Sequence, residues 1–156
     1  MGFSGEILRS QSLKVFDART ATMRLLAEQI NEENIPGDVA ELGVFKGDFA
    51  GTAIDYVDQR LLYRERARYY QGYFPDTFAR CSAEAFVSID ADLYAPTAAL
   101  PLFWDRLSPG GVLMIHDVNS TQFRGPGKAV KEFCRERKLL LVPICDLHGS
   151  VLLRKG

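Results

Sequence analysis

The segment from Val39 to Asp48 limits the possible folds more than any other part of the sequence. Residues 39–44 form a short apolar run typical of a buried strand, Gly43 and Gly47 lie four residues apart, and a helix is predicted to begin at Asp48. A strand, a glycine turn and a helix in this order open a doubly wound α/β fold. Glycines let backbone approach a ligand, and a helix N-terminus offers free N–H groups. Such turns are also common for steric reasons alone, so the segment by itself does not establish a binding site.

Strands and helices are predicted to alternate along the rest of the chain. An amphipathic helix over residues 13–30 precedes the glycine turn. The later strands are predicted at 85–89, 112–115 and 139–144, and the later helices at 96–107, with a kink at Pro101, and at 127–138. Residues 149–154 are expected to pair back onto 139–144 as an antiparallel hairpin. The pattern predicts an α/β fold with a mostly parallel sheet and an antiparallel hairpin at its C-terminal end.

Length and charge narrow the class of protein further. A chain of 156 residues is the size of one domain, so we expect a single domain over residues 1–156 with a helical lead-in over 1–36. The net charge of -1 argues against nucleic-acid binding, and no apolar run is long enough to cross a membrane. Three cysteines without close spacing suit reduced thiols, which predicts a cytoplasmic protein.

Acidic side chains follow two of the predicted strands. Asp90 and Asp92 come after the strand at 85–89, and His116 and Asp117 come directly after the strand at 112–115. In an open α/β sheet, ligands bind outside the carboxyl ends of the strands, where these side chains would converge. Carboxylates are the ligands that Mg²⁺ prefers. The sequence therefore predicts a divalent-cation site, for which helix capping is the simpler alternative.

The capping alternative applies to particular residues. Asp92 or Thr97 could cap the helix near Pro96, and Asn119 or Ser120 could cap the turn after Asp117. A histidine next to Asp117 could likewise be a metal ligand, a general base or a core imidazole bonded to backbone. His148 falls in the predicted hairpin turn, where a surface role is the simpler interpretation.

Several short motifs, taken in order, resemble the macrocin O-methyltransferase (TylF-type) family of class I S-adenosylmethionine-dependent methyltransferases. The resemblance rests on IPGDVAELGVFKG at 35–47, GYFPDT at 72–77, FVSIDADLY at 86–94, RLSPGG at 106–111, His116-Asp117 and DLHGS at 146–150. It covers nearly the whole chain and implies a Rossmann-like methyltransferase sheet. It also implies transfer of a methyl group to a hydroxyl of a small molecule, typically a sugar hydroxyl of a natural product.

The resemblance also assigns roles to individual residues. Those implied to bind S-adenosylmethionine are Glu41, Gly43, Gly47 and Asp90. Asp90 and Asp117 match acidic positions that hold Mg²⁺ in relatives, and His116 stands where some relatives have a third aspartate. Asp92 matches a position suggested as the general base, so Asp92 and His116 are the candidate catalytic residues.

The sequence departs from the family pattern after residues 58–63. Relatives continue there into an acidic segment, a loop and a helix, whereas this chain passes almost directly to residues 68–72, so several tens of residues are absent. The acid expected to bind the ribose of the cofactor lies in that segment; Asp58 or Glu65 could replace it. The alternative to an active enzyme is therefore an impaired methyltransferase-like chain that serves as a binding or oligomerising module, and the chain could form a homo-oligomer.

Overall fold

The computed structural model describes residues 5–43, 83–92, 94–98, 100–146 and 149–156. Several predictions lie outside these residues: the turn glycine Gly47, the helix from Asp48, one of the three cysteines, Cys81, the departure from the family pattern after residues 58–63, and His148. Within the described part, no helix combines the length and the apolar character that a membrane span requires.

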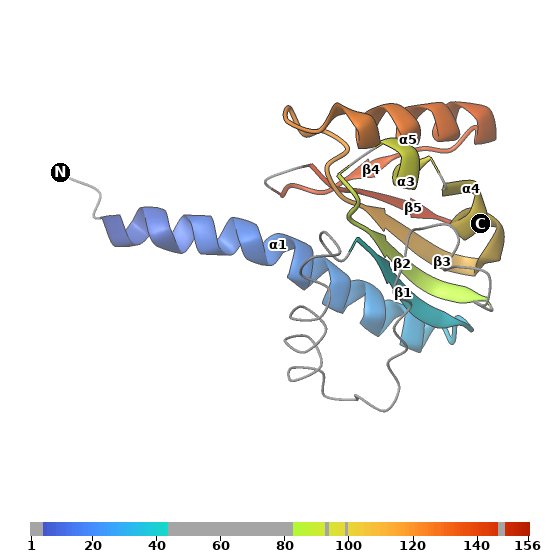
Figure 1. The fold of residues 1–156 in the computed structure, drawn as a ribbon. Helices are drawn as coiled ribbons and strands as arrows, with labels where there is room; N and C mark the ends of the chain where they lie inside the picture. The colour runs from blue at the N-terminus through green and yellow to red at the C-terminus, as the bar shows by residue number, and fades with distance from the viewer. Residues whose placement is uncertain (1–4, 44–82, 93, 99, 147–148) are drawn as a thin grey trace, which may run out of the picture.

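A five-stranded mixed sheet forms the centre of the structure (Figure 1). Its strands lie in the order β1 (Asp38–Leu42), β2 (Glu84–Ile89), β3 (Leu107–Ile115), β5 (Val151–Arg154) and β4 (Val142–Pro143). The first three are parallel, whereas β5 is antiparallel to β3 and to β4. The predicted parallel sheet and its antiparallel C-terminal hairpin are confirmed.

The parallel strands end level with one another. Leu42 of β1 is opposite Ile89 of β2, and Ile89 is opposite Ile115 of β3. The hydrogen bonds continue one residue further. The Asp90 amide donates to the Leu42 carbonyl and the His116 amide donates to the Ile89 carbonyl, each with an N···O distance of 2.8 Å. Residues that directly follow the strands are therefore neighbours in space.

Side chains alternate across the sheet, so each face has its own core. One face packs against α4 (Leu100–Arg106) and α5 (Arg124–Arg137), with a buried cluster that includes Val87, Ile89, Leu113, Ile115, Phe103, Val130 and Phe133. The other face presents Phe86, Val112 and Met114, against which Met23, Leu26 and Ile30 of α1 (Gly5–Glu32) pack. Figure 1 shows the sheet between α5 and the C-terminal half of α1, whose N-terminal half extends beyond the sheet.

Two strands differ from their predicted form. The strand at 39–44 was expected to be buried, but Val39 of β1 is 72% exposed, because β1 lies at the edge of the sheet formed by the described residues. The strand predicted at 139–144 is reduced to Val142–Pro143, which pair with Leu152 and Val151 of β5.

The helix predicted at 96–107 is in fact two helices. α3 (Tyr94–Thr97) ends before α4 begins at Leu100, which places Pro101 in the first turn of α4, where its missing N–H costs no helical hydrogen bond. The expected kink is therefore a break. β3 then starts at Leu107 and includes the turn residues 108–111, so the register with β2 shifts between Glu84 and Phe86.

The carboxylate of Asp146 holds the turn that leads into β5. It accepts hydrogen bonds from the Ser150 amide at 2.8 Å and from the Ser150 hydroxyl at 2.5 Å, and Ser150 is fully buried. Burial raises the pKa of Asp146, but hydrogen bonds from Ser150 and Gly149 outweigh it and hold the pKa below its ordinary value. The ionised carboxylate therefore stabilises this turn.

Replacing Asp146 with asparagine should lower stability in a pH-dependent way. A carboxyl with a lowered pKa in the folded chain contributes its full stabilisation above about pH 4 and loses it as the pH falls through the folded-state pKa. We expect the free energy of unfolding of the Asp146→Asn variant, measured in urea, to be about 1 kcal/mol lower than that of wild type at pH 7. This difference in free energy should become smaller towards pH 3. A Glu28→Gln variant, which alters an exposed carboxylate, is the control. A difference that stays constant with pH would contradict this role.

Candidate active site at the carboxyl ends of the strands

Three titratable side chains converge where β2 and β3 end. Asp90 follows β2, His116 and Asp117 follow β3, and their ligand atoms all lie within 4.8 Å of one another. His116 Nδ1 is 3.1 Å from Asp90 Oδ1 and 3.3 Å from Asp117 Oδ2. The convergence expected from the strand ends is therefore present, and this group is called the acidic cluster below.

Each carboxylate oxygen of Asp90 lies close to a basic side chain. Its Oδ1 faces His116, and its Oδ2 accepts a hydrogen bond of 2.9 Å from Arg19 of α1. Burial would raise the pKa of Asp90, but the hydrogen bonds and charges of His116 and Arg19 outweigh it and lower the pKa. Asp90 is therefore ionised throughout the neutral range.

His116 lies between two carboxylates. Burial lowers the pKa of His116, but the hydrogen bond to Asp90 and the charges of Asp90 and Asp117 outweigh it and raise the pKa above its usual value. Asp117 itself is only 2% exposed and has a φ of 57°, a left-handed backbone conformation that is uncommon for residues other than glycine, although aspartate adopts it more readily than most. Such strain at a buried acid is typical of functional sites.

Asp92 adjoins the acidic cluster from the loop after β2. Burial, followed by a hydrogen bond with Asp117 and the charges of Asp117 and Asp90, raises the pKa of Asp92. A carboxylate with a raised pKa is a stronger base than a free one, which suits the predicted general base. Like Asp117, Asp92 has a positive φ, of 49°.

Gly43 follows β1 and contacts the acidic cluster through backbone. Its φ is 119°, and a Cβ atom added to it would lie 1.6 Å from the carbonyl oxygen of Asp90. Glycine is therefore required here for close packing of the two strand ends, in addition to any cofactor role. Glu41 lies two residues earlier on β1, where it is exposed and opposite Ser88.

Ser120 caps the turn after Asp117, as the capping alternative predicted. Its hydroxyl oxygen accepts hydrogen bonds from the amides of Gln122 and Phe123, each with an N···O distance of 3.2 Å, so it closes the turn before α5. Asn119 donates to the carbonyl of Gly149 at 3.1 Å and thus ties this loop to the hairpin.

Arg19 is the site residue that sequence reasoning missed. It lies one helical turn before Met23, which packs on the sheet, so the anchored part of α1 brings Arg19 to the carboxyl end of β2. The helical spacing of α1 was visible in the sequence, but no local pattern links Arg19 to a carboxylate 71 residues away.

A parallel sheet with an acidic cluster and a glycine at its carboxyl edge defines a Rossmann-like α/β ligand-binding fold. The chain belongs to the macrocin O-methyltransferase (TylF) family, whose model matches residues 54–151, well over half of the chain. It is therefore a methyltransferase, as the sequence motifs implied. No curated protein sequence matches the chain.

Solved structures share the fold at low sequence identity. The O-methyltransferase NovP is 18% identical with a TM-score of 0.72, over 89% of this chain and 80% of NovP. CalS11, a TDP-rhamnose 3'-O-methyltransferase of calicheamicin biosynthesis, is 19% identical with a TM-score of 0.66, over 95% of this chain and 81% of CalS11. An O-methyltransferase from Bacillus cereus in complex with SAH is 13% identical with a TM-score of 0.65, over 94% and 91% of the two chains. These similarities establish the Rossmann-like methyltransferase fold.

Proposed function

We propose that this chain transfers a methyl group from S-adenosylmethionine to a hydroxyl of a small natural-product sugar, with a divalent cation at the acidic cluster. The observation that carries the proposal is the convergence of Asp90, His116 and Asp117 beside Asp92. The structural relatives support it, since one holds SAH and another methylates TDP-rhamnose. Glu41, Gly43, Gly47 and Asp90 would contact the cofactor.

The donor set of the acidic cluster suits a divalent cation. Asp90 and Asp117 supply two carboxylates, and His116 supplies an imidazole nitrogen, all close enough to bind one ion. Mg²⁺ commonly binds one or two protein carboxylates and keeps its other positions for water and substrate. When bound, the cation would make the acceptor hydroxyl more acidic and fix its position.

The remaining chemistry falls to residues of the chain. The acceptor oxygen attacks the methyl carbon of the sulfonium in line, an O–C bond forms, and the S–C bond breaks with its electron pair going to sulfur, which leaves S-adenosylhomocysteine. Asp92 accepts the hydroxyl proton on its carboxylate. Arg19 fixes the orientation of Asp90 through a hydrogen bond to Oδ2, and His116 lies 3.1 Å from Oδ1; such positioning is a large part of catalysis in group transfer.

Calorimetric titration with S-adenosylmethionine is the first test of this proposal. We expect a Kd below about 1 mM, within the range of typical enzyme substrates. Incubation with TDP-rhamnose should then release S-adenosylhomocysteine, with a rate that falls at least about tenfold when EDTA removes the cation. Absence of cofactor binding at millimolar concentration would overturn the proposal. Cofactor binding without transfer to TDP-rhamnose or any other sugar acceptor tested would favour the alternative of an impaired binding module.

A further inference from the structure

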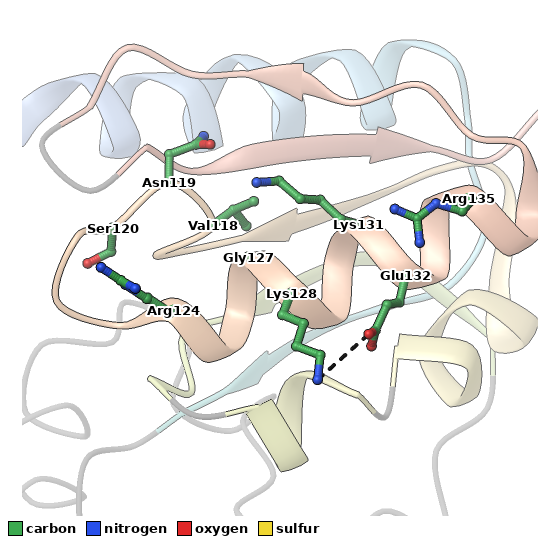
Figure 2. A pocket seen from close by; sticks show the side chains of 9 residues that line it. All are labelled: Val118, Asn119, Ser120, Arg124, Gly127, Lys128, Lys131, Glu132 and Arg135. Carbon is green, nitrogen blue, oxygen red and sulfur yellow. Dashed lines mark ion pairs between the residues drawn. The ribbon is translucent and has the colours of Figure 1, made fainter.

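A basic groove runs along α5, next to the acidic cluster. It has a volume of about 530 Å³ and is called the α5 groove here. Figure 2 shows the side chains that line it: Val118, Asn119, Ser120, Arg124, Gly127, Lys128, Lys131, Glu132 and Arg135. Four of these nine are cations and one is an anion.

The single carboxylate of the groove already has partners. Glu132 accepts a hydrogen bond of 2.8 Å from the Tyr94 hydroxyl and lies 3.9 Å from the Lys128 ammonium (Figure 2). Arg124, Lys131 and Arg135 form no ion pair with any residue that the structure describes. The α5 groove therefore has an excess of positive charge within a chain whose net charge is -1.

The α5 groove begins where the acidic cluster ends. Val118 and Asn119, which line it, directly follow Asp117. On the other side, the Tyr94 hydroxyl donates a hydrogen bond to Glu132 of the groove, and Tyr94 lies two residues after Asp92. Gly127 holds α5 against this loop, because a Cβ added to it would lie 2.3 Å from the Val118 carbonyl oxygen. The groove and the acidic cluster therefore share the loop that follows β3.

We propose that the α5 groove binds the diphosphate of a nucleotide-activated sugar, whose sugar hydroxyl is the methyl acceptor. This inference rests on the proposed function and names the form of its substrate. Phosphate oxygens are strong acceptors for arginine and lysine, whereas a free neutral sugar offers no charge for four cations to bind. The Ser120 hydroxyl oxygen accepts two amides, which leaves its proton to donate to a ligand.

The test is calorimetric titration of the protein with uridine diphosphate, inorganic pyrophosphate and inorganic phosphate, in EDTA so that no cation bridges the ligand to the acidic cluster. The variants are Lys131→Ala, Arg135→Ala and their combination. Arg24→Ala is the control, because it removes one positive charge from an exposed position on α1. Titration of every protein with S-adenosylmethionine provides the independent measurement of the proposed function.

We expect wild type and Arg24→Ala to bind both diphosphates with a Kd below about 1 mM, and inorganic phosphate more weakly. Each single variant should weaken diphosphate binding about fivefold and the double variant at least about tenfold, with binding of S-adenosylmethionine unchanged. A Lys131→Gln/Arg135→Gln double variant, checked by circular dichroism, gives the same measurement should the alanine variant misfold.

Any of three results with the phosphate ligands would overturn the inference: no diphosphate binding by wild type, equal binding by the double variant and the control, or equal affinity for phosphate and diphosphate. Tighter binding of single-stranded RNA than of uridine diphosphate, lost in the same variants, would also overturn it. If wild type binds diphosphate through Lys131 and Arg135 but does not bind S-adenosylmethionine, the proposed function fails while the groove stands as a diphosphate site.

Discussion

The Asp90→Asn variant is expected to bind a divalent cation at least about tenfold more weakly than wild type. Asparagine keeps the size of the side chain but removes its charge. Mutation of a residue that only orients a metal ligand lowers metal affinity 10- to 100-fold, and loss of a direct ligand should lower it by at least as much. Titration with Mn²⁺, a paramagnetic substitute for Mg²⁺, followed by electron paramagnetic resonance measures this directly. Methyl transfer should fall by a similar factor, because Asp90 is one of the two carboxylates that would hold the cation.

The matched control is Asp105→Asn, which neutralises an exposed carboxylate that lies 3.4 Å from Arg137, just before the start of β3 and thus at the opposite end of that strand from the acidic cluster. This variant should bind Mn²⁺ as wild type does. Equal Mn²⁺ affinity in the Asp90 variant and the Asp105 variant would show that Asp90 is not a metal ligand.

The Gly43→Ala variant is expected to lose at least about 3 kcal/mol of stability. Alanine at a φ of 119° is strained, and its methyl group would lie 1.6 Å from the carbonyl oxygen of Asp90, so β1 and the loop after β2 would have to separate. Urea unfolding at neutral pH measures the loss. Because that separation moves Asp90, Mn²⁺ affinity should fall in any fraction that remains folded.

Gly156→Ala is the control for this substitution, since nothing lies within 4 Å of a Cβ at Gly156. It should unfold at the wild-type urea concentration. If Gly43→Ala and Gly156→Ala unfolded at the same midpoint, the close approach of Gly43 to Asp90 would not exist in solution.

The order of elements and the position of the acidic cluster were predictable from the sequence because both follow local rules. Asp90 and Asp117 each come directly after an apolar strand, and parallel strands bring their carboxyl ends to one edge. The break between α3 and α4 was anticipated only as a kink at Pro101. The proline pattern shows where helical hydrogen bonding is interrupted, and packing decides whether the helix bends or restarts.

Contacts across the sheet were not predictable. Arg19 meets Asp90 only because Met23 and Leu26 anchor α1 on one particular face, a choice that depends on the whole sheet. The exposure of Val39 depends equally on which strand ends up at the edge. The α5 groove was not predictable for a related reason: α5 contains five cations among its 14 residues, but only the packing of Gly127 against the Val118 carbonyl places them beside the loop after Asp117.

Asp90 joins three segments that are distant in the sequence. Its amide bonds to Leu42, its carboxylate bonds to Arg19, and the carbonyl before it bonds to the His116 amide. Contacts between residues so far apart form only after long stretches of chain have been ordered, and chains dominated by them fold slowly. The candidate active site is thus assembled only when the first half of the chain, the central strands and the second half have come together. The cation binding that we propose for Asp90 would therefore serve as a probe of complete folding, since a fragment or partly folded chain lacks one of the three segments.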